Sequence, residues 1–304
     1  MNENASMRIP RSFGWRGAIG LLSLLLTVPA CGGAVGAGVA VGKAGGDLSG
    51  RAHTVPRGAE VCALQEALSA PAGGSEKALS DTCGKALRSD QLWRRSMIVL
   101  AAHGSTLEEL ASGKDTDNAG AIQAAGTGIR GSSWIDVESG PEQAARDAAA
   151  KLVVQMETHA AGGDLAKAIK DAGPHVKVLC DGLTAYLEAQ GKSLSDIARD
   201  AEKKHTTRAD RRCGSLDGRN LCVGESVVDR HVYGSLFGEV ALLEAEHQDA
   251  HDAVAGFCAA HRKLEEAAND GRLSSGKTYA EVVDAVKGAR RAAPAGGKAA
   301  PAKK

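Results

Sequence analysis

One stretch of the chain has the spacing of a phosphate-binding loop. Residues 271–278 read GRLSSGKT, which fits the pattern G-x-x-x-x-G-K-[ST]. Such a loop binds nucleotide because a buried strand leads into the turn and a helix begins at the Lys-[ST] pair, aiming backbone N–H groups at phosphate. Here the preceding residues, HRKLEEAAND, are charged and typical of a helix end. We therefore expect no nucleotide at Gly271–Thr278, and predict a helix stop at Asn269–Gly271 followed by a helix capped by Ser274 or Ser275.

Two Glu-x-x-His motifs have the spacing of metal ligands on one helix face. They are Glu244–His247 and Glu202–His205, and they resemble the ligand motifs of di-iron carboxylate bundles, which add two further glutamates. His251 could join Glu244 and His247 as a third ligand. Because no clear pair of inward-facing glutamates completes the set, we assign no metal ligand and expect histidines hydrogen-bonded within the helix seam. A metal-binding bundle using Glu244, His247 and His251 is the alternative.

Hydrolase signatures are absent from the sequence. It contains neither a G-x-S-x-G elbow nor H-E-x-x-H, the patterns that place a nucleophile or a zinc ion in many hydrolases. We therefore assign no catalytic residue and no cofactor, and expect a protein that is not an enzyme; an unrecognised envelope enzyme is a further alternative. The chain has 37 basic and 37 acidic residues, so no net basic field favours nucleic acid as a partner.

The N-terminus has the order of an export signal. Three arginines within residues 8–16 precede the uncharged run AIGLLSLLLTVPA, residues 18–30, which is shorter than the ~20 apolar residues of a membrane span. The run ends in VPAC at Cys31, which resembles the lipobox of bacterial lipoprotein signal peptides. The resemblance implies cleavage before Cys31, lipid such as palmitate on that cysteine, and attachment of the chain to a membrane of the bacterial cell envelope.

The residue after the cysteine adds to this expectation. Gly32 rather than aspartate follows Cys31, and in Gram-negative lipoproteins this resemblance implies the outer membrane. Two alternatives remain, because the chain is uncharged from Ala18 to Gly42: an uncleaved anchor, or an ordinary cleaved secretion signal. Each of them exports the rest of the chain, so we expect the membrane, and an unidentified envelope protein, as partners.

Six further cysteines fit an exported protein with disulfides. Cys62 and Cys83 lie symmetrically about a break at residues 71–74, so a helical hairpin would bring them level. Cys213 and Cys222 flank GSLDGRNL, a loop that a local bridge could close. Cys180 and Cys258 then remain as a pair. The alternative pairs Cys180 with Cys213 and Cys222 with Cys258; a zinc site competes with both, although no C-x-x-C occurs.

The elements that carry these residues are predicted to be helices. Aromatic residues make up only 3% of the chain, alanine and leucine are abundant, and no convincing alternating strand pattern is found. We expect helices at 59–70, 75–87, 90–112, from 141, from 164 to a break at Pro174, from 175 onwards, and at 229–269. The last has a seam at steps of four and three, namely Leu236, Val240, Leu243, His247, Ala250, Val254, Phe257, His261 and Leu264. The predicted fold class is an all-α antiparallel bundle with disulfides.

The domain organisation follows from these expectations. We predict a signal peptide at 1–30, a flexible Gly/Ala-rich tether at 31–56, the helical bundle at 57–288, and a disordered Ala/Pro/Lys tail at 289–304. The predicted function is non-catalytic binding or scaffolding at a membrane surface. Lipid on Cys31 and the tether would raise the local concentration of the bundle near its partner.

Overall fold

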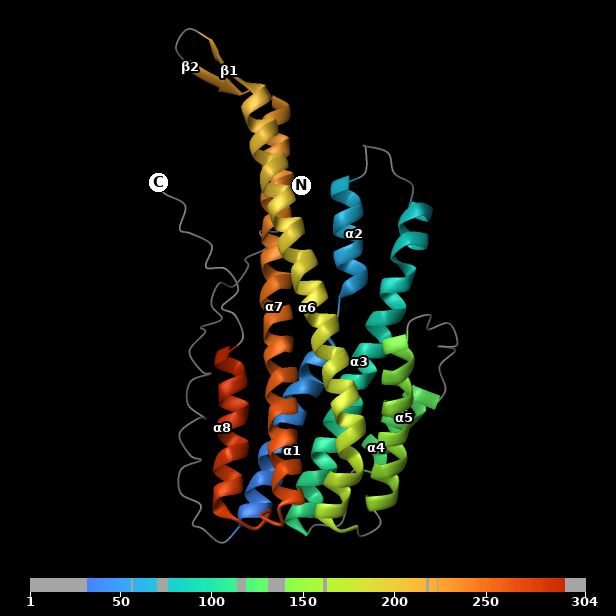
Figure 1. Ribbon diagram of the computed structural model, residues 1–304. Coiled ribbons are helices and arrows are strands. Elements are labelled where there is room, and N and C mark those ends of the chain that lie inside the picture. Colours follow the sequence, from blue (N-terminus) through green and yellow to red (C-terminus); the bar gives the residue numbers. More distant parts are fainter. Residues whose placement is uncertain are drawn as a thin grey trace, which may run out of the picture. The chain divides into compact units, whose positions relative to one another are not determined.

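Over the residues that the structure describes, the chain folds into helices and one small β-hairpin. The computed structural model describes residues 32–55, 57–69, 76–113, 119–130, 140–160, 163–216, 219–222 and 224–292, and their side chains except at 67–69, 76–82, 130, 204–216, 219–222, 224–237 and 290–292. In chain order the elements are α1 (Gly33–Ala52), α2 (Gly58–Ser69), α3 (Glu76–Ser112), α4 (Ala119–Arg130), α5 (Gly140–Ala160), α6 (Leu165–Arg212), β1 (Cys213–Leu216), β2 (Arg219–Cys222), α7 (Gly224–Asn269) and α8 (Gly276–Ala292) (Figure 1).

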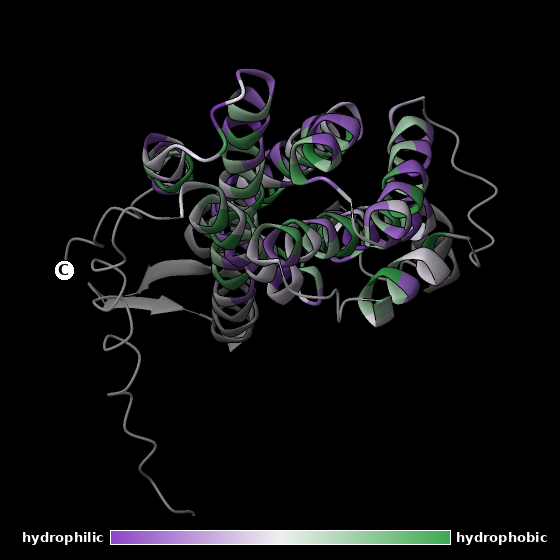
Figure 2. Ribbon diagram, turned by 90° about the horizontal axis from the view of Figure 1, so that it is seen from below, coloured by the Kyte–Doolittle hydropathy of each residue, from purple (hydrophilic) through white to green (hydrophobic). Residues whose placement is uncertain are grey.

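The helices from Gly33 onwards pack as an all-α bundle, which confirms the predicted fold class. α6 and α7 run antiparallel along each other, and α1 packs against α3, α7 and α8 (Figure 1). α5 lies against α3 and α6, and α4 against α3 and α5. Apolar residues face the neighbouring helices and hydrophilic residues face outward (Figure 2), as expected for amphipathic helices that bury one face.

Two apolar clusters fill the interior of this bundle. The larger is built almost entirely from leucine, valine, isoleucine, alanine and methionine, with Phe257 among its largest fully buried side chains. The seam predicted on α7 is confirmed: of its members whose side chains are described, all but His247 are buried. A smaller cluster joins α2 to the more distant parts of α6 and α7 through Val61, Leu194, Ile197, Val240 and Leu243.

The predicted tether is wrong over most of its length. Residues 33–52 form α1, and Ala37, Val41 and Leu48 on this helix are each 0% exposed. The tether was predicted because glycine and alanine have little side chain to bury and glycine loses much conformational entropy when it is ordered. In the folded chain their small size lets α1 approach its neighbours closely, so backbone and short side chains bury each other.

Glycine is required where α1 meets α3. A methyl group at Gly38 would collide with the Ala111 side chain, and one at Gly45 would lie 3.0 Å from the Ala101 carbonyl oxygen. At Gly104 of α3, a methyl group would lie 3.0 Å from the Val41 carbonyl oxygen and 3.4 Å from the Cα atom of Gly45. The two backbones therefore meet at a spacing that larger residues would prevent.

Two predicted helix breaks are absent. α6 runs through Pro174 without ending, and α3 is continuous from Glu76 to Ser112 although two helices were expected there. A proline inside a helix removes one hydrogen bond and costs ~3 kcal/mol. In α6 this cost is offset by packing on both sides, because Ile169 and Leu179 are each 0% exposed.

The ends of the predicted bundle also differ slightly from the structure. β1 and β2 form an antiparallel hairpin between α6 and α7, where no strand was expected. α8 continues to Ala292, so the first four residues of the predicted tail are helical. Residues 1–31 and 293–304, which include the predicted signal peptide and the rest of the tail, lie outside the described residues.

Candidate functional site

Two of the predicted disulfides are present. Cys62 of α2 is bonded to Cys83 of α3, with Cα atoms 5.7 Å apart, and Cys180 of α6 is bonded to Cys258 of α7, with Cα atoms 5.9 Å apart. The pairing of Cys180 with Cys258 is the first of the two predicted alternatives. The bridges join α2 to α3 and α6 to α7, so each one fixes a pair of neighbouring helices.

The remaining cysteines are only partly described. In the hairpin, the register places Cys213 opposite Cys222, which is the backbone arrangement that a local bridge would need. The side chains of both residues lie outside the described part, so the bridge itself stays a prediction. Cys31 also lies outside the described residues, and it directly precedes Gly32, the first residue described.

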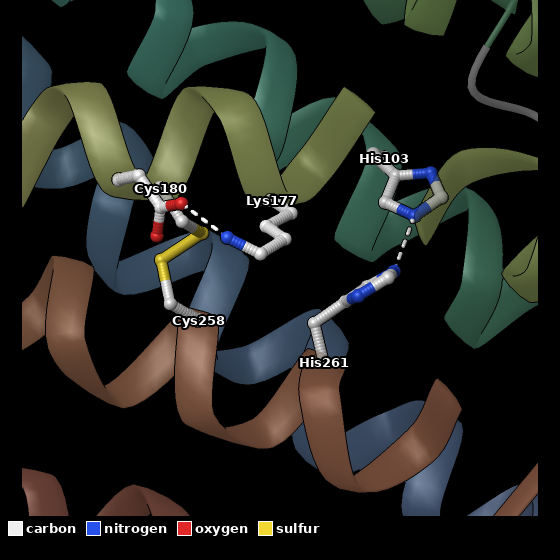
Figure 3. Close-up of a disulfide and its surroundings, with 6 residues drawn as sticks. His103, Lys177, Cys180, Cys258 and His261 are labelled. Atoms are coloured by element: carbon white, nitrogen blue, oxygen red, sulfur yellow. Dashed lines mark hydrogen bonds and ion pairs between the residues drawn. A yellow bond between two sulfur atoms is a disulfide. The ribbon is translucent and has the colours of Figure 1, made fainter. Parts of the chain in front are cut away.

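A pair of buried histidines lies close to the Cys180–Cys258 bridge (Figure 3). His261, one turn after Cys258 on α7, has its Nε2 atom 3.1 Å from Nε2 of His103 on α3. Both rings are almost fully buried, at 2% and 3% exposure. One ring must donate its Nε2–H and the other must accept it, so the accepting ring carries no proton on Nε2.

Burial explains the protonation state of this pair. Desolvation lowers the pKa of His261 to about 4. It also lowers the pKa of His103 well below its ordinary value, with smaller contributions from the charges that His261 and His159 would carry. An imidazolium ion here would lose its hydration without a carboxylate partner. The pair is therefore an internal contact between α3 and α7 that acid should break.

Glu244, His247 and His251, the ligands of the alternative metal-binding bundle, lie on successive turns of α7. His247 donates from Nε2 to the Leu187 carbonyl oxygen on α6, at 2.6 Å, and burial lowers its pKa. His251 has Nδ1 4.0 Å from Asp252 Oδ1. Among the described residues, no group of three or more His, Cys, Asp or Glu side chains is placed to hold a metal ion. Glu202 is exposed on α6. The side chain of His205 is not among those that the structure describes.

A buried carboxylate with four hydrogen-bond donors was not predicted from the sequence. Asp90 of α3 is 2% exposed and accepts from the backbone N–H groups of Gly58 at 2.7 Å and Ala59 at 2.8 Å. Tyr186 and Gln190 of α6 also donate to it, at 2.8 and 3.1 Å. Asp90 thus caps the N-terminus of α2 from another helix. No local pattern signals a cap supplied from a distance of 32 residues in sequence.

Tyr186 ties this cap to the aromatic residues of the core. Its ring stacks on Trp93, with centroids 5.5 Å apart, and Trp93 is 2% exposed. Burial, followed by the nearby Asp90 carboxylate, raises the pKa of the Tyr186 hydroxyl, so this group is a permanent donor. Trp93 and Tyr186 therefore anchor α3 to α6 within the core, because each aromatic ring buries a large apolar surface.

A small hollow of mixed polar and aliphatic lining lies beside this cap, between α2, α6 and α7. It has about 220 Å³ of empty space, less than the ~300 Å³ at which small-molecule sites usually begin. Arg57 and Glu246 form an ion pair across it, at 3.0 Å, and His247 lies in its wall. The charged groups that face the hollow therefore neutralise each other.

The phosphate-loop pattern forms the predicted helix stop and helix cap. α7 ends at Asn269, Gly271 has a φ of 68°, and α8 begins at Gly276. Ser275 Oγ accepts from the backbone N–H of Lys277 at 3.2 Å, and the Thr278 hydroxyl donates to the Arg272 carbonyl oxygen at 2.7 Å. The turn follows a helix rather than a strand, so it lacks the geometry that aims a nucleotide-binding loop at phosphate.

The comparisons with known proteins give no relative for this chain. No protein-family model, curated protein or solved structure matches it. Over the residues that the structure describes, none of the helices is both long enough and apolar enough to cross a membrane.

Proposed function

We propose that this chain is an exported, lipid-anchored protein of the bacterial cell envelope, whose helical bundle binds or scaffolds another envelope component without catalysing a reaction. The observation that carries the proposal is the pair of disulfides, Cys62–Cys83 and Cys180–Cys258. Structural disulfides persist in oxidising compartments and are rare in the bacterial cytosol. They support export independently of the N-terminal signal.

The signal itself supports the anchor. The apolar run at residues 18–30 ends at Cys31, in a sequence that resembles a lipobox, and the described domain begins at Gly32, immediately after it. A cysteine that carries lipid at this position would hold the bundle at the membrane. Gly32 in place of aspartate favours the outer membrane by the same resemblance.

The buried polar groups favour a binding role over a catalytic one. The Asp90 carboxylate is occupied by four donors, and the His103 and His261 rings by each other. These groups hold helices together rather than facing an open pocket. The surface that remains is formed by long helices, which suit contact with another macromolecule.

Lipid labelling tests the anchor. The full chain, expressed in a bacterium with labelled palmitate, should incorporate label that Cys31→Ser abolishes, and globomycin should cause the precursor to accumulate. Label that persists in Cys31→Ser, or a precursor unaffected by globomycin, would contradict the proposal.

A pull-down from solubilised envelope tests the binding role. We expect a specific envelope protein to co-purify with the wild-type chain. A variant with both Cys180→Ala and Cys258→Ala loosens α6 from α7. Comparing it with the wild-type chain tests whether binding of the partner depends on the folded bundle. Capture that is the same for the heat-unfolded chain would contradict specific binding.

Alkylation of cysteine thiols in the native protein tests export. The four cysteines of the two described bridges should react only after reduction. Six reactive thiols in the native mature protein would refute the oxidising compartment.

A further inference from the structure

We propose that the end of the bundle where α1 begins lies directly against the lipid surface, so that α6 and α7 lead away from it towards the hairpin. This inference rests on the proposed lipid at Cys31. Cys31 is joined by one peptide bond to Gly32, and α1 begins at Gly33. No length of chain is left between the anchor and the folded domain to act as a spacer.

The start of α1 is fixed to the turn between α7 and α8. A methyl group at Gly33 would overlap the carbonyl groups of Ser274 and Ser275, and one at Gly36 would lie 2.9 Å from the Tyr279 ring. Such close packing leaves α1 no room to swing away from the bundle. The anchor and the turn at residues 270–275 must therefore share the same end of the domain.

The side chains at this end suit the interface between water and lipid. Val35, in the first turn of α1, is 42% exposed, although it is apolar. Leu273 is only partly buried against the core, and Tyr279 is half-buried. An exposed aliphatic residue beside a tyrosine is the combination found where protein meets the headgroup region.

The charged side chains around the turn between α7 and α8 balance one another. Arg272 pairs with Asp270 at 2.8 Å and with Glu281 at 3.5 Å. Lys277 lies 3.6 Å from Glu281. These two cations and two carboxylates carry no net charge, so this group adds no attraction to anionic lipid. Contact should therefore depend on the anchor and the apolar residues, and not on the lipid charge.

The far end of the two longest helices is then held away from the membrane. α7 has 46 residues and α6 has 48, and each is therefore ~70 Å long at 1.5 Å per residue. The Cys180–Cys258 bridge and the contact between His247 and Leu187 keep them side by side. A partner that binds near the hairpin would therefore lie away from the lipid headgroups.

Photocrosslinking in native membranes tests the orientation. Benzoylphenylalanine in place of Val35 should form lipid adducts, and in place of Leu87 or Leu242 it should form several-fold fewer. These two controls are also exposed apolar residues, at 50% and 59%. They lie on α3 and α7, ~40 Å along the helix from the ends at Ser112 and Asn269. Equal lipid adducts at all three positions would overturn the proposed orientation.

A linker insertion separates the anchor from the orientation. A flexible Gly/Ser segment of about twelve residues between Cys31 and Gly32 keeps the lipid but frees the domain from the surface. We expect lipid adducts at Val35 to fall several-fold while palmitate label is unchanged. If adducts at Val35 persist with the linker, direct apposition is wrong and the lipid anchor stands. If palmitate label is absent from the chain without the linker, both proposals fail.

Discussion

The contact between α1 and α3 and the contact between α6 and α7 are built in opposite ways. α1 meets α3 through glycine and alanine, so that backbone atoms touch. α6 meets α7 through large side chains at helical spacing and through the Cys180–Cys258 bridge. Hydrophobic periodicity detects the second kind of contact and misses the first. The difference teaches that low side-chain volume in a segment does not by itself indicate disorder.

Removing the bridge between α6 and α7 should have the largest effect, and removing the bridge between α2 and α3 is the comparison. Replacing Cys180 and Cys258 with alanine opens a loop of 78 residues, against 21 for Cys62 and Cys83. The chain-entropy relation gives losses of about 4.5 and about 3 kcal/mol in the free energy of unfolding. Denaturant unfolding followed by far-UV circular dichroism measures both. A greater loss from the shorter loop would show that α6 and α7 do not depend on their bridge as proposed.

A leucine in place of Gly38 tests the close approach of α1 to α3. Its side chain would meet Ala111 and the Leu107 backbone, so we expect a loss of ~3 kcal/mol in stability. Gly46→Leu is the matched control, because a methyl group at Gly46 meets nothing within 4 Å. That change should leave stability unchanged or raise it by up to ~0.8 kcal/mol, since glycine is a poor helix former. Equal effects of the two changes would mean that α1 is not packed on α3.

Acid should destabilise the buried histidine pair that joins α3, a member of the first contact, to α7, a member of the second. His103 of α3 faces His261 of α7, and burial lowers the pKa of His261 from 6.5 to about 4. The unfolded chain then binds the proton more readily, so stability is full above pH 6.5 and falls as the pH drops towards 4. The linkage relation gives a loss of about 2 kcal/mol at pH 5 relative to pH 8.

A double variant isolates this effect from the carboxylates. His103→Leu with His261→Phe removes both titrating rings, and its stability should change less with pH between 8 and 5 than that of the wild-type chain. Urea unfolding at each pH measures the difference. Parallel pH profiles for the two proteins would contradict the assignment to this pair.

The smallest expected effect concerns the cap of α2. Tyr186→Phe removes one of the four donors to Asp90 but keeps the ring stacked on Trp93. The loss of one hydrogen bond should lower the free energy of unfolding by ~1 kcal/mol. Tyr279→Phe leaves the Asp90 cluster intact and serves as the control. An equal loss in both variants would show that the bond to Asp90 contributes nothing particular.

Much of the bundle could be predicted from local patterns. The seam of α7 and the stop at Gly271 each follow from residues close together in sequence. The Cys62–Cys83 pairing followed because an antiparallel helical hairpin brings symmetric cysteines level. The Cys180–Cys258 pairing was one of two alternatives that the sequence left open.

Features that depend on distant residues could not be predicted in this way. Asp90 caps a helix 32 residues away, and His103 and His261 lie 158 residues apart in sequence. The continuity of α6 through Pro174 depends on its packing against other helices. For α1, the sequence does contain a helical signal. Gly38, Gly42 and Gly45 recur at steps of four and three, which places them on one helix face.

The mass of the N-terminal peptide of the mature protein tests the central proposal most directly. If Cys31 is the anchor, protein purified from the envelope should yield a peptide that begins at Cys31 and carries the added mass of its lipid. A peptide from the native protein that begins at residue 1 or 7, or one that spans residues 30 and 31 with a free thiol, would contradict the proposal.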